Sequence, residues 1–166
     1  KLELTSGQIK LNGDLSFSSD SPLKGSMDFG LENIGGRYDQ TPFEGLNGVI
    51  PFADIAPSSW RIDPAAPLSL KQAGKGSLLE NGKIILTGGA PAGLLWEKID
   101  FDLGGGHLSF HPFNKGKPDS KKSEIILREI DMGKLAEIAE IDGLKADGKI
   151  EGNLPLEIGP HGFVVT

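Results

Sequence analysis

The histidines and aspartates are the residues whose types could support metal binding or acid–base catalysis. His107 and His111 are four residues apart, a spacing that lets two imidazoles share one metal ion on a helix. They lie instead in an alternating pattern that predicts a strand, where four residues span about 13 Å, too far for one ion. Asp100 and Asp102 share one strand face, as catalytic carboxylates can, but they alternate with apolar residues and we interpret them as solvated. We therefore expect no metal site.

Two glycine-rich stretches could bind phosphate groups, and both depart from the patterns that do so. Residues 74–77 (GKGS) resemble the end of a phosphate-binding loop, but Ser69 replaces its first glycine and Gly76 stands where Ser or Thr must hold magnesium. Residues 104–106 (GGG) are followed by Ser109 at the place of the third glycine of a dinucleotide-binding motif. The sequence has no nucleophile elbow either. We expect no enzyme activity and no cofactor.

The composition excludes several classes of protein. The 166 residues carry a formal charge of -6, which disfavours extended contact with nucleic acid. With no cysteine, the chain cannot form disulfides or a thiolate metal site. Its 24 glycines and 11 prolines oppose long helices, and no apolar run approaches the roughly 20 residues of a membrane-spanning helix. We interpret residues 1–166 as a single all-β segment excised from a longer protein.

Alternation of apolar and polar residues is the strongest signal, and it predicts strands with one apolar face. It occurs at 9–17, 23–31, 99–103 and 150–158, the first of these as a continuous strand bulged at Gly13. Glycines within the apolar faces (Gly13, Gly25 and Gly152) are expected to bend the sheet. Our candidates for the lining of an apolar groove or core are Leu23, Met27, Phe29, Leu31, Ile99, Phe101, Leu103, Leu154, Leu156 and Ile158.

Turn signals separate these strands. Asn47-Gly48 and Asn81-Gly82 predict two-residue hairpins, and residues 104–106 predict a third. The proline-rich residues 57–67 predict an irregular connection that packs Trp60 back on the sheet, and residues 114–123 a flexible loop. Helical spacing occurs only near 133–142. The expected fold is mainly β: a curved, elongated antiparallel sheet, as a U-shaped trough or a sandwich, with one short helix. Periodicity does not distinguish an open apolar groove from a closed core.

Four stretches together resemble the C-terminal region of YdbH-type proteins, which belong to the AsmA-like group of Gram-negative envelope proteins. They are residues 45–55 (GLNGVIPFADI), 80–86 (ENGKIIL), 99–110 (IDFDLGGGHLSF) and 141–156 (IDGLKADGKIEGNLPL). The resemblance covers residues 45–166, and residues 1–44 match only in style. This region of the family has carried a "dicarboxylate transport" label, although a dicarboxylate site needs clustered basic residues and the three arginines are far apart in sequence.

The resemblance implies a long periplasmic protein, anchored in the inner membrane by a helix outside this chain. Its β-sheet would form a trough along which phospholipid tails slide between the inner and outer membranes. A small outer-membrane lipoprotein would pair at the C-terminal end, and neighbouring sheet of the same protein at the other edge. The alternatives are a structural or protein-interaction β-module of the envelope, and a domain that binds a small solute such as a dicarboxylate.

Overall fold

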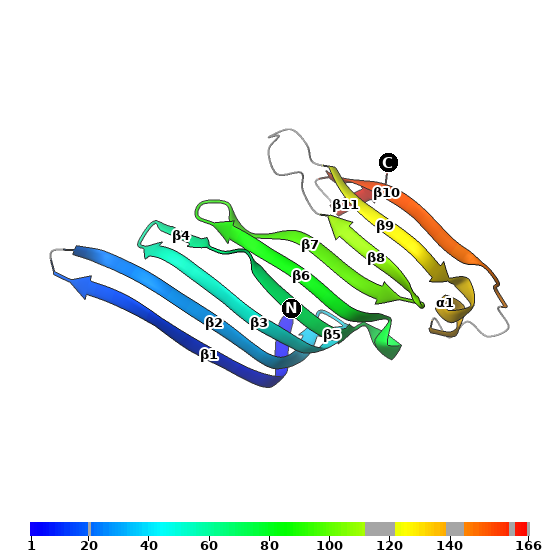
Figure 1. The fold of residues 1–166 in the computed structure, drawn as a ribbon, viewed down its shortest axis with the longest axis horizontal. Helices are drawn as coiled ribbons and strands as arrows, with labels where there is room; N and C mark the ends of the chain where they lie inside the picture. Colours follow the sequence, from blue (N-terminus) through cyan, green and yellow to red (C-terminus); the bar gives the residue numbers. More distant parts are fainter. Residues whose placement is uncertain (20, 112–121, 139–144, 160–161, 166) are drawn as a thin grey trace.

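The chain folds into one curved antiparallel sheet, as a computed structural model shows for residues 1–19, 21–111, 122–138, 145–159 and 162–165 (Figure 1). This confirms the expected fold class. Within the described residues the strands are β1 (Leu2–Ser18), β2 (Ser21–Tyr38), β3 (Thr41–Ala56), β4 (Ser59–Ile62), β5 (Ala66–Ala73), β6 (Leu79–Gly89), β7 (Gly93–Leu103), β8 (Gly106–His111), β9 (Lys122–Asp131), β10 (Lys149–Gly159) and β11 (Gly162–Val165). A 3₁₀ turn, η1 (Lys75–Ser77), and one helix, α1 (Met132–Ile138), complete the description.

The strands pair in the order of the sequence, with one exception at the centre. The short strand β4 and the following strand β5 lie end to end between β3 and β6, and each pairs with both neighbours. The four strands therefore form a closed circuit of pairing inside the sheet. The connection expected at residues 57–67 thus contains strand β4, and Trp60 packs against buried apolar residues as expected.

One face of the sheet is apolar across nine strands, because directly paired residues share a face. A single row of paired residues, which we call the central row, runs from β1 to β10 with β4 bypassed. The central row consists of Ile9, Leu31, Gly48, Leu68, Ile84, Ile99, Phe110, Ile125 and Leu154.

Bulges in the left-handed conformation keep this face apolar along strands of up to 18 residues. In β1 the apolar residues are even-numbered before Gly7 (φ 101°) and odd-numbered after it. In β2 they change from odd to even at Asn33 (φ 49°). The same change of parity occurs at Gly45 in β3 and at Asn81 in β6. Each bulge adds one residue to its strand, so that the apolar side chains after the bulge again lie on the apolar face of the sheet.

These four bulges form a line across the sheet, the bulge row: Gly7, Asn33 and Gly45 lie on adjacent strands, and Asn81 follows on the far side of Lys71 in β5. The backbone N–H of Asn33 donates to Oδ1 of Asn47, and Nδ2 of Asn47 donates to the carbonyl of Gly45, both at 2.8 Å. The carbonyl of Asn33 lies against Gly7. Bulges bend the strand that carries them, and β1 is visibly bent near its N-terminal end (Figure 1). Glu129 (φ 51°) produces the same change of parity in β9.

The two Asn-Gly hairpin predictions are wrong. Asn47-Gly48 lies in the middle of β3, and Asn81-Gly82 lies within β6. Asn81 does have a positive φ (51°), as the turn prediction requires, but its conformation produces a bulge rather than a reversal. The third hairpin is confirmed, since Leu103 pairs with Gly106 around the turn.

The bulge expected at Gly13 is also absent, although the continuous strand there is confirmed. Residues 12, 13 and 14 pair in unbroken register with residues 28, 27 and 26. A Cβ on Gly13 would collide with the carbonyl of Ser26, so close approach of the strands accounts for this glycine. Shifts of register do occur beside Gly25 and Gly152.

The helix α1 is confirmed at the expected place, at Met132–Ile138, and residues 139–142 of that prediction lie outside the described residues. Leu135 packs toward the turn at Gly104. Residues 114–121 of the expected flexible loop also lie outside the described part, whereas Lys122 and Ser123 begin β9.

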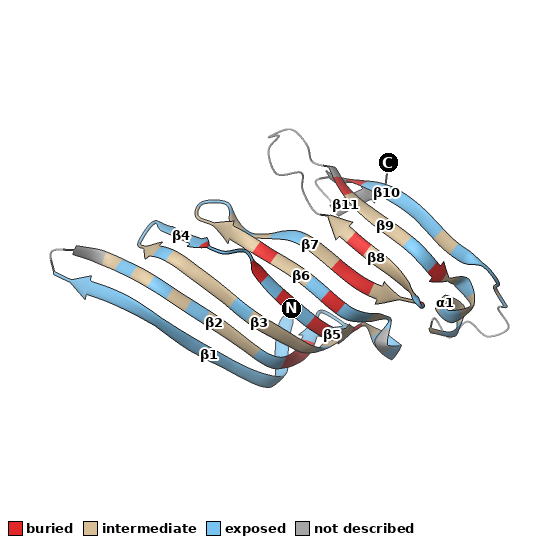
Figure 2. Cartoon of the chain, viewed as in Figure 1, coloured by how far each residue is buried: buried red, intermediate tan, exposed pale blue. Residues whose placement is uncertain are grey.

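Burial is concentrated at the centre of the sheet (Figure 2). Ile62, Ala66, Leu68 and Leu86 form one buried apolar cluster, and Leu70, Ala73 and Phe101 form a second. In contrast, every residue of the edge strand β1 is exposed, including its leucines. Apolar surface thus stays in contact with solvent toward the edges of the sheet.

Candidate functional site

The candidate site is the apolar face of the sheet. It carries the described groove or core residues named from the sequence: four in β2, three in β7, and Leu154 and Leu156 in β10. Leu31, Ile99 and Leu154 belong to the central row itself. Met27 and Phe29 pair with Phe52 and Ile50, and Phe101 with Leu108, on the same face. Their role in lining a lipid path stays a prediction.

Their exposure differs. Leu23, Met27, Phe29, Leu31, Ile99 and Leu103 are half-buried, Phe101 and Leu156 are buried, and Leu154 is 38% exposed. Ile158 pairs with Phe163, but its side chain is outside the described part of the structure. The strands β2, β7 and β10 are not neighbours in the sheet. Their apolar residues are therefore connected only through rows of paired residues on the strands between them.

Sequence reasoning missed the strands that connect these residues. Leu68 and Leu70 in β5 alternate with Ser69 and Lys71, which is a strand signal, but the prolines before them suggested an irregular connection. Ile84 was assigned to a hairpin, and its place in the central row follows only from the bulge at Asn81. With these strands in place, the central row crosses nine strands, and the eight spacings of about 4.8 Å between them add up to about 38 Å.

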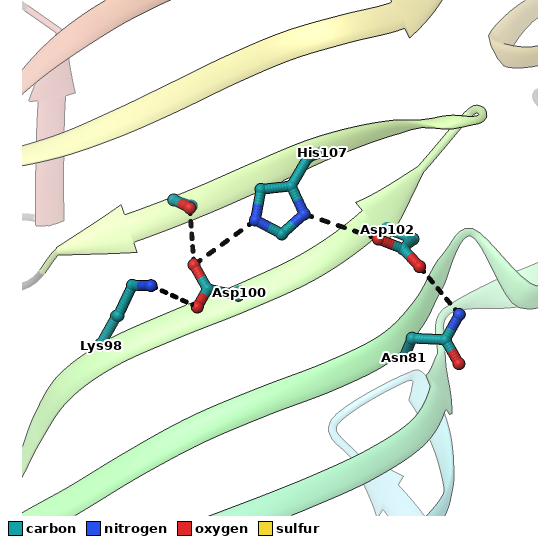
Figure 3. A network of polar contacts seen from close by, with 6 residues as sticks. Asn81, Lys98, Asp100, Asp102 and His107 are labelled. Atoms are coloured by element: carbon teal, nitrogen blue, oxygen red, sulfur yellow. Dashed lines mark hydrogen bonds and ion pairs between the residues drawn. The ribbon is translucent and has the colours of Figure 1, made fainter.

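The opposite face is more polar and contains a network around two aspartates (Figure 3). Oδ1 of Asp100 accepts a hydrogen bond from the Ser109 hydroxyl at 2.5 Å, and Oδ2 lies 2.7 Å from Nζ of Lys98. His107 lies between the two carboxylates, with Nε2 3.6 Å from Asp100 and Nδ1 3.5 Å from Asp102. Asp102 also accepts a hydrogen bond from Nδ2 of Asn81 at 2.8 Å.

Asp100 is only 9% exposed, so the prediction that it belongs to a solvated face is wrong. Its burial opposes ionisation, but the hydrogen bonds from Lys98 and Ser109 and the charges of Lys98 and His107 outweigh this and lower its pKa. The pKa of Asp102 is lowered chiefly by the hydrogen bond from Asn81. The arrangement joins β6, β7 and β8 by charged and hydrogen-bonded side chains, and nothing in its geometry indicates catalysis.

Other site classes find no geometric support within the described residues. They contain no cluster of three or more His, Asp or Glu side chains that could hold a metal ion. The three arginines lie on different strands, β2, β4 and β9, and Arg61 is paired with Asp54 and Asp63 at 2.6 and 3.1 Å. In this part of the chain, no helix is long and apolar enough to cross a membrane.

A one-layered antiparallel sheet with one continuous apolar face and one polar face defines an elongated amphipathic β-sheet protein. The chain belongs to the YdbH-like family, whose model, described as intermembrane phospholipid transport protein YdbH, matches residues 1–166. The match includes residues 1–44, where the sequence motifs gave only a likeness of style. The family is one of lipid transport proteins. Neither the search of curated proteins nor that of solved structures gives a match.

Proposed function

We propose that this chain carries phospholipid acyl tails along the apolar face of its sheet, parallel to the central row. The observation that supports this most directly is the row itself. It offers apolar side chains or glycine on nine strands, each paired with the next, so that a tail stays in contact with apolar surface over about 38 Å. Membership of a phospholipid transport family supports phospholipid as the molecule that is carried.

The mechanism needs no chemical step. Contact with the apolar face shields a tail from water at about 25 cal/mol per Å² of buried area. Movement along the face exchanges one set of apolar contacts for a similar one, so no single position holds the tail strongly. The central row consists of Gly48 and apolar residues, so it presents no polar side chain that would stop a tail.

The full-length context is part of the same proposal. The edge strand β1 pairs only with β2, and β11 only with β10, among the described residues. Free edges of this kind accept another strand by β-augmentation. We assign the β1 edge to neighbouring sheet of the longer protein and the β11 edge to a small outer-membrane lipoprotein. The location would be the periplasm, with an inner-membrane anchor outside this chain.

Photo-crosslinking at matched positions tests the proposal. Leu11 is 61% exposed on the apolar face, and the adjacent Asn12 is exposed on the other face. Leu154 and Asn153 form a second such pair on β10. With a photoreactive residue at each position in the protein expressed in cells, we expect phospholipid adducts at Leu11 and Leu154 only. Equal adducts at Asn12 and Asn153 would contradict the proposal and favour a structural module.

A further inference from the structure

The apolar face is not equally open along its length. In the central row, Ile9 is 44% exposed, Leu68 is 6% exposed and Leu154 is 38% exposed. Part of this difference reflects the position of β1 at the edge of the sheet. However, Phe29 and Phe110 on the interior strands β2 and β8 are only half-buried. Pairing within one sheet therefore leaves apolar side chains half-buried. The deeper burial at the centre means that other side chains cover the apolar residues there.

The cover consists of the protein's own side chains. Leu86 is 2% exposed and lies in a cluster with Ile62, Ala66 and Leu68. The two aromatic residues that pack against this cluster are Phe52 and Trp60. Their ring centroids are 5.7 Å apart at an interplanar angle of 57°, a tilted contact typical of a favourable aromatic pair.

We infer that Phe52 and Trp60 form a constriction at the centre of the apolar face, and that it limits the cross-section of the acyl tail that can pass. This inference rests on the proposed function. Toward β1 and β10 a tail meets exposed apolar side chains. At the centre the buried cluster already fills the face, so a tail must displace the aromatic rings to continue, and a wide tail must displace them further.

The strand that carries Trp60 is suited to such movement. β4 has four residues, between β3 with 16 and β6 with 11. Its only paired position with β6 joins Arg61 to Gly89, and a hydrogen bond from Ala90 to the carbonyl of Trp60 adds to it. The side chain of Trp60 is half-buried, whereas Ile62 two residues later is 6% exposed.

Uptake of tails of different width tests the inference. The purified chain is mixed with vesicles of phosphatidylglycerol that carry either straight acyl tails or tails ending in pyrene, and bound lipid is measured after separation. We expect the unmodified chain to prefer straight tails, and Trp60→Leu to raise the ratio of pyrene to straight tails several-fold. The matched control is Trp96→Leu, because Trp96 lies on the same face beside Leu86 but is 45% exposed, whereas Trp60 is half-buried against the cluster.

The outcomes separate this inference from the proposed function. An unchanged ratio in Trp60→Leu, in a chain whose folding is verified by circular dichroism, overturns the constriction, while binding of straight tails still supports the proposed function. An equal rise in Trp96→Leu also overturns it. Failure of every variant to bind either tail contradicts both proposals. Should Trp60→Leu not fold, Phe52→Leu applies the same test, with the same expected direction, from the other ring.

Discussion

The left-handed conformation of Asn81 gives a prediction whose magnitude follows from the structure. Asn81 has φ 51° and donates a hydrogen bond to Asp102. Asn81→Gly keeps the conformation and removes only this hydrogen bond, at a cost of about 1 kcal/mol for an exposed pair. Asn81→Ala adds the left-handed penalty of about 1–2 kcal/mol. Asn81→Val adds a further cost because a β-branched side chain fits this region poorly.

A shift of register is the competing way to relieve this strain, and it is more costly. Without the bulge, the buried Leu86 and the half-buried Ile84 would move to the polar face, and Leu86 alone would lose about 1.5–3 kcal/mol of burial. We therefore expect the bulge to persist in all three variants.

Denaturation in urea of the purified variants measures the free energy of unfolding, which should fall in the order Gly, Ala, Val, with unchanged m-values. The hydrogen bond adds an independent readout, because the pKa of Asp102, lowered mainly by Asn81, should rise in all three. A valine variant as stable as the glycine variant would refute the argument that this backbone conformation holds the register.

Three further predictions concern the two faces and the core. With the photoreactive residue at Leu154, Leu11→Asp should lower the yield of lipid adducts and leave stability within about 0.5 kcal/mol, since position 11 is exposed; Asn12→Asp should leave both unchanged in the same crosslinking and urea assays. Leu86→Ala should lower the free energy of unfolding by about 2–5 kcal/mol, and Leu94→Ala, at a 54% exposed site, by less than about 1 kcal/mol. Because the pKa of Asp100 is lowered in the folded state, its stabilisation is present above its ordinary value of 3.8 and is lost as the pH falls below it. The melting temperature should therefore fall less steeply with pH below 3.8 in Asp100→Asn than in the unmodified chain. An equal slope would contradict the stabilising role of the network around Asp100.

Much of the architecture follows from alternation in the sequence. The strands β2, β7 and β10 were predicted correctly because the apolar residues in each run for several positions without a change of parity. The β7–β8 hairpin was found because its reversal needs consecutive glycines, and Gly104 and Gly105 do have positive φ.

The errors share one physical cause. Asn-Gly is favourable both in a two-residue turn and in a strand that contains a left-handed residue, and local sequence does not show whether the strand continues beyond it. At Asn81 the continuation depends on pairing with β5, which is formed by residues distant from the dipeptide. The burial of Asp100 was missed for a similar reason, because Ser109 and His107 reach it from the neighbouring strand.

The bulge row separates two dimensions of the molecule. Each of the strands β1, β2, β3 and β6 contains its own bulge, at Gly7, Asn33, Gly45 and Asn81, so in this part of the sheet the cross-section is determined strand by strand. The length of the sheet depends only on how many strands are paired in sequence order. A hairpin added or removed as a unit changes the distance that the sheet spans and preserves its cross-section. In contrast, deletion of one residue at a bulge moves the remaining apolar side chains of that strand to the polar face.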